Sequence, residues 1–205
     1  MADTKENILR TALRLFARDG YEAVSTSAIA GELGMTKGAL YKHYKNKRAI
    51  FDSIVERMYQ IDAERSQACA VPQEVYADAP ESYRGVTIPA VQAFTRAQFR
   101  FWTEDAFASD FRRMLKLEQY RSQEMAALYS QCLTAGPVAY MADIFREMQA
   151  RSLLQPGDPQ QLALEFYAPM YLLMDLPASE ENAALLEAHM AAFLGRHAGK
   201  EGNAL

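Results

Sequence analysis

Apolar residues recur every three or four positions along almost the whole chain, and this helical spacing is what most limits the possible fold. Residues that favour helices, such as Ala, Leu, Glu, Gln, Met and Arg, are abundant. Runs of Val and Ile that alternate with polar residues, which a half-buried sheet needs, are nearly absent. With 205 residues, 50% of them hydrophobic, the chain can bury a sizeable core. The sequence therefore predicts an all-α protein.

Breaks in the apolar pattern predict where individual helices begin and end. The first helix ends at Asp19-Gly20, and the segment 71–87, with two prolines and a glycine, predicts an irregular connection. Pro156-Gly157-Asp158-Pro159 is a clear stop and restart, with Asp158 as the N-cap and Pro159 at the first helical position. The other expected helices span residues 26–33, 37–44, about 47–66, 88–102, 104–118, 122–132, 137–150, 159–176 and 179–196.

Two short helices on either side of Gly34 form the most distinctive local pattern. Such a pair builds a poor core, but it presents its second helix well to the major groove of DNA. Leu40 and Tyr44, with Met35 before them, lie on one face of the second helix and can dock it onto the preceding helices. The sequence therefore predicts a helix-turn-helix domain over residues 1–47.

The opposite face of this second helix carries groups that suit DNA. Lysine can reach a phosphate or a guanine edge, tyrosine and histidine can donate to phosphate oxygens, and small residues let the backbone approach the bases. The outward set consists of Lys37, Gly38, Ala39, Tyr41, Lys42 and His43. Further candidates for phosphate contacts are Thr36 before the helix, Lys47 at the start of the next one, and Ser25 and Thr26 at the start of the preceding one.

Charge is distributed unevenly in a way that fits this interpretation. Residues 1–55 contain nine Lys/Arg and six Asp/Glu, a net charge of plus 3, within a chain whose total is minus 4. The rest of the chain therefore carries minus 7. An acidic body discourages indiscriminate binding to polyanions, while a small basic region can be directed at phosphates.

The stretch LRLFARDGYEAVSTSAIAGELGMTKGALYKHYKNKRAIFDSIVERM resembles the DNA-binding domain of the tetracycline-repressor (TetR) family. The shared pattern is G-Y-x-x-x-[ST], then IA, LG, [ST]-K-G-x-LY-x-[HY]-[FY] and a final K. The resemblance implies DNA contacts by Thr36, Lys37, Gly38, Ala39, Tyr41, Lys42, His43 and Lys47. Ala39 stands where the family more often has Thr, so a hydroxyl contact is lost there.

The resemblance also implies a homodimeric, all-helical regulator with a variable C-terminal domain that binds a ligand. We expect this ligand-binding and dimerisation domain to span residues 48–205, with the helix at about 47–66 as the connector. The expected partners of the whole protein are double-stranded operator DNA of palindromic sequence and a small, mostly apolar effector that releases the DNA. The expected function is that of a ligand-responsive transcriptional repressor.

The aromatic residues of the C-terminal part supply candidates for the effector site. Trp102 is the favoured one, because its indole N–H needs a polar partner and could orient a ligand. Ordinary helical cores use the same residues, so most aromatic side chains are expected to serve only the core. The candidates are Phe94, Trp102, Phe107, Phe111, Tyr129 and Phe145.

The last two predicted helices carry more apolar surface than one core requires. Segment 159–176 is apolar around most of its circumference, and 179–196 has small residues that allow another helix to approach closely. A four-helix bundle formed with the same pair from a second subunit would cover this surface, although a larger monomeric core would do so too. The candidate interface residues are Phe166, Tyr167, Met170, Tyr171, Met174, Ala188, Ala191 and Ala192.

Other classes of function find little support in the sequence. Cys69 and Cys132 lack the spacing of a redox or zinc motif, and the three histidines are scattered, so no metal or cofactor is expected. No catalytic motif suggests an enzyme, and no signal peptide or apolar span suggests a membrane, so we expect a cytoplasmic protein. The alternative is a helical small-molecule binding protein or enzyme with a vestigial DNA-binding domain, which would lack sequence-selective DNA binding.

Overall fold

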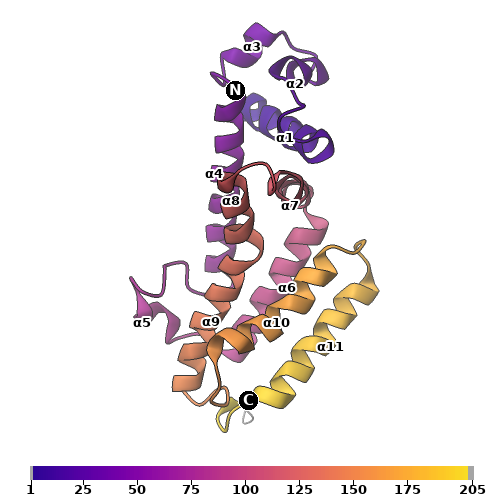
Figure 1. The fold of residues 1–205 in the computed structure, drawn as a ribbon. Helices are drawn as coiled ribbons and strands as arrows, with labels where there is room; N and C mark the ends of the chain where they lie inside the picture. The colour runs from indigo at the N-terminus through magenta and orange to yellow at the C-terminus, as the bar shows by residue number, and fades with distance from the viewer. Residues whose placement is uncertain (1, 203–205) are drawn as a thin grey trace. The chain divides into compact units, whose positions relative to one another are not determined.

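The computed structural model describes residues 2–202, and these are almost entirely helical (Figure 1). No strand occurs among them, so the predicted all-α class is confirmed. The eleven helices of this part of the chain are α1 (Ala2–Asp19), α2 (Thr26–Glu32), α3 (Lys37–Tyr41), α4 (Lys47–Ala68), α5 (Pro80–Tyr83), α6 (Ile88–Glu104), α7 (Ala106–Glu118), α8 (Gln123–Leu133), α9 (Ala135–Ala150), α10 (Pro159–Met174) and α11 (Glu180–His197).

Most predicted breaks coincide with observed helix ends. Asp158 caps α10 by accepting a hydrogen bond from the Gln160 amide at 3.0 Å, and Pro159 opens that helix. The third helix is shorter than the predicted 37–44 and ends at Tyr41. Beyond it the chain tightens, because the amides of Lys42 and His43 bond to carbonyls three positions back, those of Ala39 and Leu40, at 3.3 and 2.9 Å. The predicted irregular connection at 71–87 contains the short helix α5.

The first of two compact units, unit 1, comprises the chain up to Asp62 together with Asp105–Tyr129. Within it, α1 packs along α7, and α2 packs on α1 and on α3. Burial of each large apolar side chain contributes about 1.5–3 kcal/mol to the stability of this core. The core includes Ile8, Leu13, Phe16, Ile29, Leu40, Ile50, Ile54, Phe107, Phe111 and Met114.

Unit 2 comprises Ala63–Glu104 and the chain from Ser130 onward. Helix α10 contacts α6, α9 and α11, so it lies at the centre of this unit (Figure 1). Its Phe166 meets Phe145 of α9 edge-on at 5.4 Å and Phe193 of α11 at 5.0 Å, between ring centroids. Phe145 and Phe193 also stack at 5.5 Å. These three rings therefore join α9, α10 and α11 into one core.

The observed division of the chain differs from the predicted boundary at residue 47. Unit 1 keeps α4 as far as Asp62 and also contains α7, which we had assigned to the second domain. The physical reason is that α7 buries Phe107, Phe111 and Met114 in the core of unit 1. The assignment of ligand binding to the rest of the chain stays a prediction. None of the described helices is long and apolar enough to cross a membrane.

Candidate nucleic-acid interface

A tight turn at Gly34 sets the geometry between α2 and α3. Gly34 has φ of +63°, in the left-handed region that favours glycine, and a Cβ at this position would meet no neighbouring atom within 4 Å. The Gly34 amide bonds to the Gly31 carbonyl at 3.0 Å, and the Met35 amide bonds to the Ala30 carbonyl at 2.9 Å. Backbone bonding therefore fixes the direction in which α3 leaves α2.

Hydroxyl side chains cap the starts of both short helices. Ser25 Oγ accepts from the Ala28 amide at 3.0 Å, and Thr36 Oγ1 accepts from the Ala39 amide at 3.1 Å. Both residues are exposed, and each hydroxyl keeps its own O–H to donate to a phosphate oxygen. The caps thus hold these two predicted contact residues at the edges of the short helices.

The residues predicted to contact DNA on and just after α3 are exposed or half-buried, and their role in DNA contact stays a prediction. Leu40 is fully buried, whereas Lys37, Gly38, Tyr41 and Lys42 are exposed, and Ala39 and His43 are half-buried. The Tyr41 hydroxyl lies 3.2 Å from Thr26 Oγ1 on α2, and the Lys37 ammonium lies 5.6 Å from the centroid of the Tyr41 ring. The hydrogen bond with Thr26, supported by Lys37, lowers the pKa of Tyr41.

Many of the positive charges in unit 1 are paired with acids. Arg10 pairs with Glu6, Arg14 with Glu32, Arg18 with Asp19, and Arg48 with Asp52 and Glu124. By contrast, Lys37 and Lys42, together with Lys45 just beyond α3, take part in no ion pair among the described residues. Three lysines without an acidic partner therefore lie on α3 and just beyond it, where they are available to a phosphate.

Lys47, the first residue of α4, makes hydrogen bonds within its own chain that the sequence did not predict. Its ammonium donates to the carbonyl of Tyr21 at 2.7 Å and to that of Glu22 at 3.3 Å. It also lies 4.3 Å from the centroid of the Tyr21 ring. An ammonium has three N–H bonds, so two carbonyls leave one for a phosphate. The role of Lys47 in DNA contact stays a prediction, but its structural role was missed.

The predicted ligand residues are divided between the two units. Phe107 and Phe111 are core residues of unit 1, where the Arg10 guanidinium lies 5.8 Å from the Phe107 ring, and Tyr129 ends that unit. Phe145 is fully buried in the α9–α10–α11 core. Phe94, 5.8 Å from Tyr140, and the buried Trp102, 5.4 Å from Phe101, are the members that remain within α6 of unit 2.

The predicted dimer residues also divide into two groups. Phe166, Tyr167, Met170 and Met174 are at most 8% exposed within a single chain, so they serve its own core and not a partner-facing surface. Tyr167 in addition donates its hydroxyl to the Leu133 carbonyl at 2.9 Å. Tyr171 is half-buried, and Ala188, Ala191 and Ala192 are exposed. The exposed large residues of α10 and its C-terminal end are instead Leu164, Leu172 and Leu176, with Leu185 on α11.

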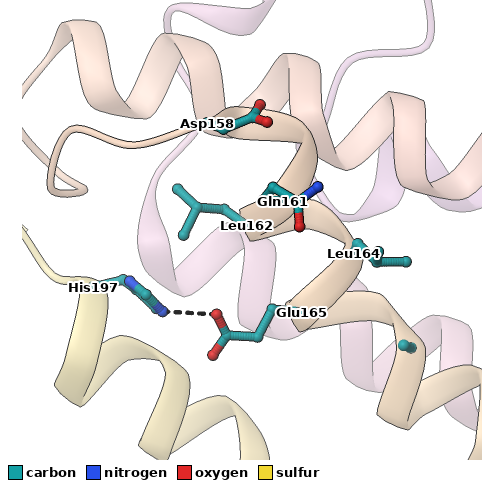
Figure 2. Close-up of a pocket in the computed structure, with 7 residues that line it drawn as sticks. Asp158, Gln161, Leu162, Leu164, Glu165 and His197 are labelled. Atoms are coloured by element: carbon teal, nitrogen blue, oxygen red, sulfur yellow. Dashed lines mark hydrogen bonds and ion pairs between the residues drawn. The ribbon is translucent and has the colours of Figure 1, made fainter.

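An open pocket of about 490 Å³ lies against α10 and the end of α11, and the sequence analysis missed it (Figure 2). Glu165 holds both helices there, because it accepts from Arg196 at 2.5 Å and lies 3.0 Å from His197 Nε2. The Arg196 hydrogen bond, with a further contribution from His197, lowers the pKa of Glu165. Helical spacing could have predicted this group of polar residues, since the N-cap Asp158 falls on the same face of α10 as Gln161 and Glu165.

Comparison with known proteins places the N-terminal part in a family. Residues 8–54 match the model for "Bacterial regulatory proteins, tetR family". The chain is 45% identical over 56 residues to an uncharacterized HTH-type transcriptional regulator, YerO of Bacillus subtilis, a match that covers 27% of this chain and 19% of that protein. It is 43% identical over 58 residues to the tetracycline repressor protein class C of Escherichia coli, covering 28% and 26%. The matches thus span about a quarter or less of these relatives' length.

Solved structures resemble the chain over nearly its whole length. SmeT, the repressor of the Stenotrophomonas maltophilia multidrug efflux pump SmeDEF, has a TM-score of 0.64 at 21% identity, over 96% of this chain and 91% of SmeT. A gamma-butyrolactone receptor has a TM-score of 0.61 at 18% identity, over 95% and 97%. At this identity the likeness concerns the fold alone. The matching sequence, together with the helix-turn-helix that it forms, places residues 8–54 in the TetR family of bacterial regulatory proteins.

Proposed function

We propose that this chain is a ligand-responsive transcriptional repressor that binds a palindromic operator as a homodimer. The observation that carries the proposal is the unneutralised positive charge at α3, since Lys37 on this helix and Lys42 at its C-terminal end are exposed and lack acidic partners. The hydroxyls of Thr26 and Tyr41 bond to each other, so one of their two O–H groups is left to donate to a phosphate beside α3. Phosphate contacts by these groups would position α3, and base contacts would select the sequence.

The direct test begins with selection of duplexes from genomic fragments, followed by binding titrations at several salt concentrations. We expect a Lys37→Ala/Lys42→Ala variant to bind the selected duplex more weakly and with a smaller salt slope, by about 0.9 per lost phosphate contact. Lys200→Ala, which removes an exposed lysine of unit 2, is the control and should keep wild-type affinity. Wild-type binding without sequence preference, or unchanged binding by the double variant, would favour the alternative of a vestigial domain.

We propose that an exposed apolar face on α10 and α11 forms the dimer. Leu172, Leu185 and Leu164 are 63%, 51% and 49% exposed, and large apolar side chains that face solvent on neighbouring helices are suited to bind a partner. The exposed Ala188, Ala191 and Ala192 on α11 allow a second helix pair to approach closely. A two-fold axis through this face would pair α10 and α11 of one subunit with the same two helices of the other, in an isologous four-helix interface. The two half-sites of a palindrome require a dimer with this two-fold symmetry.

A charge on this face tests the dimer without disturbing the core. We expect Leu172→Glu to shift the protein from dimer to monomer in sedimentation velocity at micromolar concentration, because the carboxylate would be buried without a partner. Tyr120→Glu is the matched control, since Tyr120 is 89% exposed but belongs to unit 1. A wild-type monomer at this concentration, or a Leu172→Glu dimer as stable as wild type, would contradict the proposed interface.

We propose that the effector is small and mostly apolar and binds unit 2. Several structural neighbours are described as a triclosan complex, a flavonoid-responsive regulator and a gamma-butyrolactone receptor, which supports a ring-containing effector here. Trp102 is the single tryptophan and is 8% exposed, so its fluorescence can report a ligand near α6. An effector found this way should weaken the binding of the protein to its operator about 5- to 150-fold. The operator should weaken the binding of the effector by the same factor. Equal effector affinity with and without operator would rule that compound out.

A further inference from the structure

Glu118, the last residue of α7, is a buried carboxylate in unit 1. It is 2% exposed, and among the side chains that the structure describes it is the one charged group in the buried set. Burying a charge is costly unless the group is paired and hydrogen-bonded, so its surroundings must compensate for the lost hydration. None of the predicted DNA contacts includes this residue.

The carboxylate of Glu118 closes the turn between α1 and α2. Its Oε1 accepts from the Tyr21 amide at 2.9 Å, across 97 positions of sequence, and its Oε2 lies 3.4 Å from Arg121 Nε. Gly20 has φ of +86°, and a Cβ at this position would lie 3.0 Å from Glu118 Oε1. Glycine therefore gives the turn both its backbone conformation and the space that the carboxylate occupies.

Tyr21 connects this turn to the start of α4. Its ring packs edge-on between Phe16 and Phe51, with centroid distances of 5.1 and 5.3 Å. Its carbonyl accepts from the Lys47 ammonium at 2.7 Å, and its ring faces that ammonium at 4.3 Å. The two backbone polar groups of Tyr21 are thus held from opposite directions, the N–H by Glu118 and the C=O by Lys47.

We propose that Glu118 is a positioning residue for DNA binding, which acts through Tyr21 to hold the Lys47 ammonium where it can reach a phosphate. The inference rests on the proposed function, because it assigns Lys47 a phosphate contact. Without the Glu118 acceptor, the Tyr21 N–H would be buried without a partner and the turn would rearrange to satisfy it. The carbonyl and the ring that orient Lys47 would move with the turn.

The test compares wild type, Glu118→Ala, Glu118→Gln and Lys47→Ala on a duplex selected by the wild-type protein, with binding measured across a range of salt. Because Glu118→Ala would act through the phosphate contact of Lys47, we expect it to weaken binding by up to the same factor as Lys47→Ala does. The salt slope should also fall by about 0.9 per subunit, the loss of one phosphate contact, as in Lys47→Ala. Glu118→Gln keeps an oxygen that can accept from the Tyr21 amide, so its affinity and its salt slope should both be close to those of wild type.

The double variant Glu118→Ala/Lys47→Ala separates positioning from general stabilisation. If Glu118 acts through Lys47, its replacement should cost less than about threefold once Lys47 is absent, since coupled sites are not additive. Glu124→Gln is the control, because Glu124 also pairs with α4, through Arg48, but lies exposed. It should not lower the salt slope.

Amide hydrogen exchange without DNA provides a second measurement. The Tyr21 amide should exchange faster in Glu118→Ala than in wild type and recover in Glu118→Gln. If Glu118→Ala does not fold, Glu118→Asp, whose shorter side chain withdraws the carboxylate from Tyr21, should show the same reduced slope.

The inference and the proposed function fail in different ways. Wild-type protein that selects no duplex overturns the proposed function and this inference with it. If wild-type protein binds DNA, either of two results overturns this inference alone. One is that the losses of affinity in Glu118→Ala and Lys47→Ala multiply in the double variant. The other is that the salt slope of Glu118→Ala stays at the wild-type value.

Discussion

At the scale of single residues, the ammonium of Lys47 has an acidic neighbour that competes with DNA. Glu22 Oε2 lies 3.8 Å from Lys47 Nζ, and the Glu22 side chain is 68% exposed. A phosphate that approaches Lys47 must displace this carboxylate or share the ammonium with it. Exposed ion pairs contribute about 0.2–1 kcal/mol, so Glu22→Gln should strengthen operator binding up to about fivefold at low salt.

Glu32→Gln is the control for this prediction, because it removes another exposed acid of unit 1 that pairs with Arg14 instead. Both variants change the net charge alike, so any general electrostatic gain appears in both. Titrations at low and high salt should show an additional gain for Glu22→Gln that disappears as salt screens the charges. Equal affinities for the two variants would mean that Glu22 does not compete.

Sequence reasoning identified the chemical nature of the candidate contacts but not their partners. Lys37, Tyr41 and Lys42 could be assigned to the outward face of α3 because Leu40 and Tyr44 define the inward one. Lys47 was expected to contact phosphate, and its bonds to two carbonyls were not foreseen. Such bonds depend on how the α1–α2 turn packs against α4, and the spacing of residues along the chain does not predict that contact.

At the scale of elements, two glycines in the helix-turn-helix should respond oppositely to the same substitution. Neither would bring a new Cβ within 4 Å of a neighbour, so only the backbone conformation decides. Gly34 has φ of +63°, and alanine there should lower the free energy of unfolding by about 1–3 kcal/mol. Gly31 lies inside α2, and alanine there should raise it by about 0.5–1 kcal/mol. Urea unfolding that gives both changes the same sign would contradict this account of the turn.

The contact between α10 and α11 should loosen in acid. The Arg196 hydrogen bond, with His197, lowers the pKa of Glu165 from its ordinary 4.5, so the charged form is favoured in the folded protein. The stabilisation is therefore present above pH 4.5 and is lost as pH falls towards the lowered pKa. Glu165 is partly exposed, so the effect is modest. In Glu165→Gln, the unfolding free energy should vary less between pH 6 and pH 3 than in wild type, and an unchanged acid dependence would contradict the assignment.

Helix α7 shows what the sequence could not reveal about elements. Its existence follows from periodicity, and its N-cap Asp105 accepts from the Ala108 amide at 2.9 Å. Its partner does not follow, because the apolar face with Phe107 and Phe111 would fit either unit. The structure pairs it with α1, far away in sequence. The same ambiguity led us to group these rings with Phe94 and Phe145 as candidates for a ligand site.

At the scale of the whole molecule, the all-α class and the helix-turn-helix could be predicted, whereas the division into units could not. Two of the three boundaries between units fall inside helices, after Asp62 in α4 and after Tyr129 in α8, so no break in the helical pattern marks them. The third, after Glu104, coincides with the break between α6 and α7. The dimer face illustrates the same limit. Leu172 and Phe166 are equally apolar in the sequence, and the packing of α10 against α9 and α11 decides which of them is buried.

The central claim, sequence-specific binding of a dimer to a palindrome, is tested most directly by hydroxyl-radical footprinting of the wild-type protein on a selected duplex. Two α3 helices related by a two-fold axis require two protected half-sites of inverted sequence, with centres about one helical turn of 10–10.5 base pairs apart or a multiple of it. Lys37→Ala/Lys42→Ala should weaken protection at both half-sites together. A single protected patch, or uniform protection that does not depend on sequence, would contradict the account.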